Sequence, residues 1–332
     1  ANKGVALHEL GRFDDALLSY DRALALDPED AECRRNRAMT LLLLGRLAEG
    51  WQAYEARWRT ARFKGQDRGG KVPRWTSAGA EPGATVLVRA EQGFGDTIQF
   101  ARYAALLECP AALRRLMTSL DGVIQVVEQG DDSLPGHDYQ IPLMSLPGAF
   151  DTDLATIPAD VPYLRAPDQD CADWRRRLDK LAGPRIGIVW KGSPDHPRDR
   201  VRSPGLAPFL PLLDLSGATL VSLQMGGGTD LAAHGADAVV DMTPDLRDFA
   251  ATAALIECLD LVVTCDTAVG HLAGALGRPA AMLLPHVPEW RWLLERDDTP
   301  WYPTMRLFRH PAAGDWDGTV KSLVSYIRRH WL

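Results

Sequence analysis

The sequence predicts an all-α repeat segment followed by two α/β lobes, each built on a parallel, doubly wound sheet. Three observations predict this class. A set of residues recurs at a fixed interval near the N-terminus, apolar runs alternate with helical stretches from residue 85 onward, and one apolar run turns directly into a helix at Asp266. Strands that alternate with helices are typical of parallel sheets covered by helices.

The N-terminal segment contains an internal repeat. Five residues return after 34 positions: Asn2, Leu7, Gly11, Arg12 and Tyr20 recur as Asn36, Leu41, Gly45, Arg46 and Tyr54. A 34-residue period is typical of tetratricopeptide helix pairs, and we expect the two helices of each unit to join at the Gly-Arg pair. In the second unit Gly50 and Arg57 stand where a small alanine is usual, so we expect this unit to end the array against the next domain. Two amphipathic hairpins without repeat ancestry are the alternative.

The first α/β lobe follows a segment rich in glycine and basic residues. We expect strands at 85–90, 123–127 and 139–141, and a helix over 97–107 after the glycine loop 91–96. Such a lobe usually has a further strand after this helix, but the chain passes at once to Pro110. Either the lobe lacks one strand or a segment is absent from the sequence.

A second lobe follows Gly183-Pro184. The apolar runs predict strands at 185–190, 218–223, 238–241, 259–263 and 280–284, and helices at 206–215, 246–259, after Asp266 and at 317–331. In open parallel sheets, ligands bind at the carboxyl ends of the strands. We therefore look for a site in the loops at these ends.

Composition excludes several classes. A net charge of -7 argues against a general nucleic-acid-binding protein. Five separated cysteines without a C-x-x-C pair are typical of a reduced compartment, so we expect a cytoplasmic protein with no disulfide framework and no bound metal. No apolar run approaches the roughly 20 residues of a membrane helix. The chain starts inside a repeat, so we expect further sequence before Ala1.

The segment from Asp266 to Pro279 is the most informative. An apolar run ends in Asp266-Thr267-Ala268 and passes into a helix that carries His271 and stops near Gly277. The first turn of a helix presents backbone N–H groups without intrahelical partners, and these bind phosphate. The segment predicts a phosphate site formed by Asp266, Thr267, Ala268 and His271. A packed or capping role for His271 is the alternative.

Three other strand ends carry candidate residues. In the loop Gln92-Gly93-Phe94-Gly95-Asp96, Asp96 is either a helix cap or a catalytic carboxylate. After residue 190, a basic loop could bind a diphosphate, or it is only a solvated loop. Its candidate ligands are Lys191, Ser193, Arg200 and Arg202. Gln224 and Met225 end another strand, where their backbone could pair with a nucleobase or form an ordinary turn.

Aromatic residues gather near the C-terminus. Trp290, Trp292, Trp301 and Tyr302 lie in one segment with Arg291. Aromatic rings stack on sugars and bases but also fill cores, and we expect packing with some exposure of Trp290 to the cleft. Motifs of zinc hydrolases and serine esterases are absent from the sequence, which leaves those reactions without support.

Taken together, these motifs resemble bacterial tetratricopeptide-repeat glycosyltransferases. The residues that carry the resemblance are the repeats, Glu91 to Phe100, Asp266 to Ala273, Trp290-Arg291-Trp292 and Pro300 to Pro303. The catalytic part is similar to the heptosyltransferases of glycosyltransferase family 9 and more distantly to O-linked N-acetylglucosamine transferases. The resemblance implies a GT-B fold of two Rossmann-like lobes behind the repeats, no metal or other cofactor, and a nucleotide-sugar donor.

The resemblance also implies roles for residues. Asp96 matches the presumed general base, Asp266, Thr267 and His271 match the helix start that holds the donor diphosphate, and Lys191 matches a basic donor ligand. Gln92, Gly93, Gly95 and Trp290 are then expected at the cleft. The family often has an acid where Ala251 stands, so one polar contact is expected to be missing.

We therefore expect repeats at 1–62, a linker at 63–83, an acceptor lobe at 84–166, a donor lobe at 167–314 and a closing helix at 315–332. The expected activity is inverting, metal-independent transfer of a sugar to an acceptor, with a protein or peptide held by the repeats. A non-catalytic scaffold and a GT-B nucleotide-sugar epimerase are the alternatives.

Overall fold

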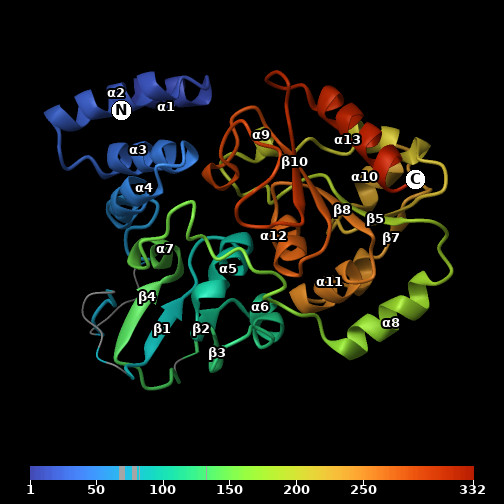
Figure 1. Ribbon diagram of the computed structural model, residues 1–332, viewed down its shortest axis with the longest axis horizontal. Coiled ribbons are helices and arrows are strands. Elements are labelled where there is room, and N and C mark those ends of the chain that lie inside the picture. Colours follow the sequence, from blue (N-terminus) through green and yellow to red (C-terminus); the bar gives the residue numbers. More distant parts are fainter. Residues whose placement is uncertain (67–71, 77–80, 82, 132) are drawn as a thin grey trace.

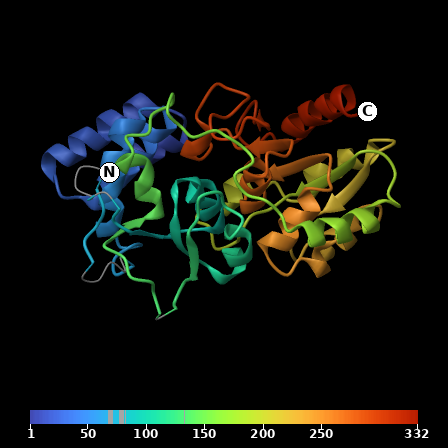
Figure 2. The ribbon, with the colours of Figure 1, turned by 60° about the horizontal axis from the view of Figure 1, so that its bottom comes forward.

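The structure is a computed structural model that describes residues 1–66, 72–76, 81, 83–131 and 133–332. The predicted linker at 63–83 lies partly outside the described residues. Helices α1–α4 lie above the first lobe, and the second lobe lies beside both (Figure 1). Figure 2 shows the two lobes side by side from another direction.

The repeat segment consists of two helix pairs followed by a short 3-10 helix, η1. Its elements are α1 (Asn2–Glu9), α2 (Phe13–Leu26), α3 (Ala31–Leu43), α4 (Leu47–Tyr54) and η1 (Glu55–Arg59). Gly11 and Gly45 join the helices of each pair with φ angles of 74° and 77°, a left-handed conformation that glycine adopts without strain. The predicted position of both turns is therefore confirmed.

The first lobe is a parallel sheet in the order β3-β2-β1-β4 among the described residues. Its strands are β1 (Val86–Arg89), β2 (Leu106–Cys109), β3 (Gln125–Glu128) and β4 (Tyr139–Pro142). Its helices are α5 (Phe94–Phe100), α6 (Ala111–Met117) and α7 (Leu146–Ala149). Because β1 is central, the loop after it reaches the middle of the sheet's carboxyl edge.

The expected helix over 97–107 is wrong in its second half. Helix α5 ends at Phe100, a 3-10 turn covers Ala101–Tyr103, and β2 follows. All four residues of β2 are buried between β1 and β3. A short apolar run without alternation does not distinguish a buried strand from a helix, so the sequence pattern did not predict this strand. The further strand that such a lobe usually has is thus present.

The second lobe is a larger parallel sheet, in the order β10-β9-β8-β5-β6-β7 within the described residues. The strands are β5 (Arg185–Val189), β6 (Thr219–Ser222), β7 (Val240–Asp241), β8 (Leu261–Cys265), β9 (Ala280–Leu284) and β10 (Met305–Arg309). The helices are α8 (Asp168–Leu178), α9 (Asp199–Arg202), α10 (Gly228–Ala233), α11 (Phe249–Ile256), α12 (Ala268–Ala275) and α13 (Trp316–His330). The five expected strands are present, whereas β10 was not predicted. The segment predicted as a helix over 206–215 is a 3-10 helix, Ala207–Asp214, with Pro211 inside it.

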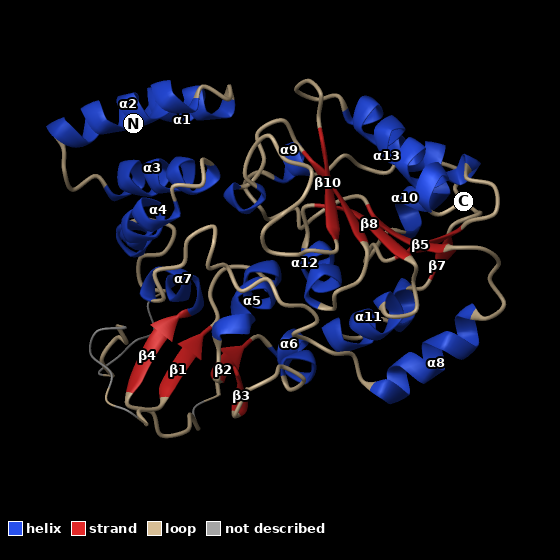
Figure 3. Cartoon of the chain, in the orientation of Figure 1, coloured by secondary structure: helices blue, strands red, loops and turns tan. Residues whose placement is uncertain are grey.

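Both sheets and their helices appear in Figure 3, with α5 and α12 between the two sheets. The lobes are joined by charged side chains as well as by apolar packing. Arg115 of α6 donates to Asp248, the cap of α11, at 2.8 Å and to Asp170 of α8 at 2.6 Å. These contacts hold the lobes closed against each other.

Candidate active site

The starts of α5 and α12 meet where the two lobes join. Gly93 is the N-cap of α5, and Thr267 is the N-cap of α12. A Cβ atom added at Gly95 would lie 2.8 Å from Cδ2 of His271 and 3.5 Å from Cα of Ala268. The structure therefore brings the two predicted helix starts into direct contact, and only glycine permits so close an approach.

Asp96 lies in the first turn of α5 and has two different partners. Its Oδ2 accepts the backbone N–H of Gly93 at 2.8 Å, as in a capping box. Its Oδ1 accepts a hydrogen bond from Arg291 of the second lobe. With a side chain 17% exposed, Asp96 both caps its own helix and links the two lobes.

Arg291 is the centre of a buried polar cluster that sequence analysis did not assign. It lies in the 3-10 turn η6 (Trp290–Trp292) and also contacts Oε1 of Gln99 and, at 2.8 Å, Oε2 of Glu289. Burial raises the pKa of the Glu289 carboxyl to about 7, although the charge of Arg291 acts in the opposite direction. The signal that could have identified this cluster is a pair of charged residues inside an aromatic, apolar segment.

His271 is 4% exposed and lies against the lobe interface. Its Nδ1 forms a hydrogen bond with the Tyr302 hydroxyl at 3.0 Å, and its ring stacks on Trp292. Burial, together with the charge of Arg291, lowers the pKa of His271 well below its usual value of 6.5. The ring is therefore uncharged at neutral pH.

The candidate ligands in the basic loop after β5 do not all lie at the same place. Arg202 donates to the carbonyl oxygen of Asp266 at 2.9 Å, next to the start of α12. Lys191 is 39% exposed and pairs with Asp230 of α10 at 2.7 Å. Ser193 and Arg200 are exposed. Arg202 thus joins the helix start directly, whereas Lys191 lies beside it on the neighbouring strand end.

Gln224 and Met225, predicted to contact a nucleobase at the end of β6, differ in their surroundings, and Gln224 has a structural role. The Gln224 side-chain oxygen accepts the backbone N–H groups of Trp190 at 3.2 Å and Lys191 at 2.9 Å. Gln224 therefore fixes the loop after β5, while Met225 is exposed. Asp230, which orients Lys191, was missed because nothing in its sequence surroundings distinguishes it from a surface acid.

Trp290 does not line an open cleft, which corrects the expectation from the sequence. It is 2% exposed and packs edge-on against Trp51 of α4, with ring centroids 5.1 Å apart. On another side it stacks on Phe100 of α5. The end of the repeats covers Trp290, an arrangement that sequence periodicity does not reveal.

The repeats are also bonded to the glycine loop. Arg57 of η1 is fully buried and forms two hydrogen bonds with Glu91, at 2.7 and 3.1 Å, and one with Ser145 at 2.8 Å. The side-chain amide of Gln92 donates to the Tyr54 hydroxyl at 3.0 Å. The end of the repeats therefore holds the loop that presents Asp96.

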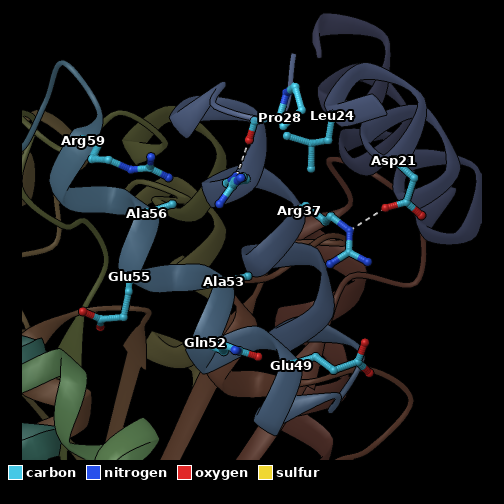
Figure 4. A pocket seen from close by; sticks show the side chains of 11 residues that line it. Asp21, Leu24, Pro28, Arg37, Glu49, Gln52, Ala53, Glu55, Ala56 and Arg59 are labelled. Carbon is cyan, nitrogen blue, oxygen red and sulfur yellow. Dashed lines mark hydrogen bonds and ion pairs between the residues drawn. The ribbon is translucent and has the colours of Figure 1, made fainter. Parts of the chain in front are cut away.

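A hollow with a volume of about 710 Å³ lies among α2, α3, α4 and η1 (Figure 4). Charged side chains of both signs line this hollow: Asp21, Arg34, Arg37, Glu49, Glu55 and Arg59. Several are already paired, since Arg37 contacts Asp21 at 2.7 Å. The surface is thus polar and mixed in charge.

Two features are absent from the described part of the chain. Its helices include none with the length and apolar character that crossing a membrane requires. The same residues contain no group of three or more His, Cys, Asp or Glu side chains placed to hold a metal ion.

Comparison with known proteins gives two family matches. Residues 1–30 match the tetratricopeptide repeat, and residues 230–287 match glycosyltransferase family 9 (heptosyltransferase). The chain is also 28% identical to Protein FlbA of Caulobacter vibrioides over 98% of its own length. It spans 60% of the length of FlbA.

The chain is also similar to solved structures. The E. coli ADP-heptose LPS heptosyltransferase II is 14% identical and has a TM-score of 0.51, over 74% of this chain and 99% of that one. The E. coli heptosyltransferase WaaC with ADP-2-deoxy-2-fluoro heptose is 13% identical, with a TM-score of 0.47 over 73% of this chain and 99% of that one.

The predicted fold class is confirmed: a helical region with a tetratricopeptide-repeat match precedes an α/β part with the GT-B fold. The part of the chain that matches glycosyltransferase family 9 contains β8 and α12. These findings support glycosyltransferase activity.

Proposed function

We propose that this chain transfers a sugar from a nucleotide-sugar donor to a hydroxyl group of a protein held by the repeats. The observation that carries the proposal is the meeting of two helix starts from different lobes, one with Asp96 and one with Thr267. A carboxylate and a phosphate-binding helix start are the two groups that such a transfer needs.

In this proposal the second lobe holds the donor. The start of α12 at Thr267 and Ala268, with Asp266 shaping the turn, faces the diphosphate. Arg202 is next to this turn because it bonds to the Asp266 carbonyl. Lys191, Ser193 and Arg200 add positive charge or hydrogen bonds from the neighbouring loop, and Gln224 with Met225 receives the base. Cationic and N–H groups stabilise the diphosphate as negative charge develops on it.

Asp96 is the proposed general base on the first lobe. It takes the proton of the acceptor hydroxyl while the acceptor oxygen forms its bond to the anomeric carbon of the sugar. The bond from that carbon to the diphosphate breaks, and its electron pair leaves with the diphosphate. Direct displacement of this kind inverts the anomeric configuration, and we propose that it requires no metal.

The proposed acceptor site is the hollow among α2, α3, α4 and η1 (Figure 4). Repeat arrays of helix pairs form extended surfaces for binding peptides. Charged side chains of both signs favour a polar peptide over an apolar one. The bonds from Arg57 to Glu91 connect this part of the chain to the loop of Asp96.

The proposal is tested by nucleotide binding and by Asp96→Asn. We expect one member of a panel of UDP, GDP, ADP, dTDP and CMP to raise the melting temperature, since a ligand that binds only the folded state stabilises it. We expect ADP to be the nucleotide that binds, because the similar solved structure is an ADP-heptose LPS heptosyltransferase. Release of nucleoside diphosphate from the matching nucleotide sugar should then fall by about 100-fold or more in Asp96→Asn, with nucleotide affinity retained. Full activity in this variant would remove Asp96 from the mechanism.

The same assay separates the alternatives. A scaffold would neither bind the nucleotide nor release sugar, and an epimerase would alter the donor sugar without any acceptor. Activity in excess EDTA tests metal independence.

A further inference from the structure

We propose that Arg291 is a positioning residue for Asp96, supplied by the second lobe to the first when the lobes close. This inference rests on the proposed function, because it concerns the proposed base. It is carried by one arrangement: a guanidinium from one lobe that bonds to the carboxylate of the other.

Arg291 is anchored on its own lobe before it reaches across. Its carbonyl oxygen accepts the Trp301 indole N–H at 3.1 Å, and its guanidinium lies over the Trp290 ring at 4.6 Å. Glu289 binds both its guanidinium, at 2.8 Å, and its backbone N–H, at 3.1 Å. The side chain is 8% exposed, so its direction is fixed by packing.

The first lobe supplies two acceptors for this group. Arg291 bonds to Asp96 and Gln99, which lie three residues apart on α5 and therefore on the same face of the helix. A planar guanidinium with several donors fits such a pair better than an ammonium group does. The contact is thus a specific fork and not a diffuse charge attraction.

Both oxygens of Asp96 are consequently defined, one from each lobe. Oδ2 is held by the Gly93 N–H of the first lobe and Oδ1 by Arg291 of the second. An ionised carboxylate has about four acceptor positions, and these two bonds occupy about half of them. The orientation of the base toward an acceptor hydroxyl is therefore complete only when the lobes are closed.

Glu289 explains how the guanidinium tolerates the reaction. When Asp96 takes the acceptor proton it becomes neutral, and a buried cation without a counter-ion is unfavourable. At a pH above its pKa of about 7, Glu289 is ionised beside Arg291 and keeps the charge compensated. Arg291 can therefore serve Asp96 through the whole cycle without leaving its place.

The test is a double-mutant cycle of Arg291→Met and Asp96→Asn, with steady-state release of nucleoside diphosphate as the readout. We expect Arg291→Met to lower kcat by about 10-fold to 100-fold, since misplaced groups lose rates of this order, while KM for the nucleotide sugar changes less than about 3-fold. In the Asp96→Asn background the same substitution should change kcat by less than about 2-fold, because coupled residues are not additive. An equal loss in both backgrounds would show a merely structural role and overturn the proposal.

If Arg291→Met does not fold, Arg291→Lys provides a second test of the proposal. It keeps the charge but loses the fork, so kcat should fall by about 3-fold to 10-fold, and unchanged kcat would overturn the proposal. Arg309→Lys is the matched control, because this arginine of the same lobe bonds to the carbonyl oxygens of Arg296 and Trp292. We expect its kcat to stay within about 2-fold of the wild type. Full activity of Asp96→Asn with Arg291 present would refute the proposed role of Asp96 as the base. A loss of activity in Asp96→Asn but not in Arg291→Met or Arg291→Lys would refute this inference alone.

Discussion

Gly95→Ala is the most direct test of how the lobes meet. The added Cβ would lie 2.8 Å from Cδ2 of His271, whereas carbon atoms pack at about 3.5–4.0 Å. Helices α5 and α12 must then separate by roughly 0.7–1.2 Å. His271 cannot easily turn aside, since it bonds to Tyr302 and stacks on Trp292.

The energy can be estimated from two opposing effects. Overpacking a closely fitted interface costs about 1–3 kcal/mol, and alanine in place of glycine returns up to about 1 kcal/mol of helix propensity. We expect a net destabilisation of about 1–2 kcal/mol, which lowers the melting temperature by roughly 2–6 °C. The same widening loosens the contact between Arg291 and Asp96, so turnover should fall more than stability alone implies.

Thermal melting and nucleotide release measure both effects, with Gly228→Ala as the control. Gly228 begins α10, and a Cβ there would make only an ordinary contact, 3.8 Å from Asp241. This variant should melt at or slightly above the wild-type temperature. If Gly95→Ala behaves like Gly228→Ala in both assays, the two helices do not pack as described.

Two further predictions concern the repeats. Burial, aided by the charge of Arg198, lowers the pKa of His8 from 6.5 to about 4. Between these pH values the unfolded state binds a proton that the folded state does not. The free energy of unfolding should therefore fall by up to about 3 kcal/mol as the pH drops from 6.5 to 4. The melting temperature of His8→Gln should change less with pH across this range than that of the wild type. An equal pH dependence in the two proteins would contradict the assignment. Arg57→Met leaves the buried Glu91 carboxylate without its guanidinium and should cost about 3–5 kcal/mol in chemical unfolding. Arg59→Met, in the same turn but at an exposed ion pair, should stay within about 0.5 kcal/mol of the wild type, and equal losses in the two variants would refute the buried role of Arg57.

Local patterns predicted the positions of most elements. The repeat turns, the strand before Asp266 and the helix after it follow from glycine placement and apolar runs, which act within a few residues. Strand β2 was missed because pairing with β1 and β3, and not local preference, decides its conformation. Strand β10 was missed because it follows an aromatic, proline-rich segment and alternates only weakly.

The candidate site could be predicted only in part. Asp96 and the Thr267 segment stand at recognisable strand ends, so their neighbourhood follows from the rule for parallel sheets. Arg291 lies 195 residues after Asp96, and Arg57 lies 34 residues before Glu91. Such pairs form through the packing of distant elements, and no spacing in the sequence encodes them.

The contacts of the repeats indicate which parts would move together if the two lobes open for the proposed donor. Trp51 donates to the carbonyl oxygen of Thr152 at 2.9 Å, and Arg57 holds Glu91, so the repeats are bonded to the first lobe through buried polar groups. Their polar contact with the second lobe is a partly exposed ion pair between Glu9 and Arg198 at 3.2 Å, and pairs of this kind contribute little. Opening would therefore break this ion pair and the packing of Trp51 on Trp290, and it would keep the buried hydrogen bonds to the first lobe. An acceptor on the repeats would stay in fixed register with Asp96 while the second lobe brings the donor and Arg291 to it.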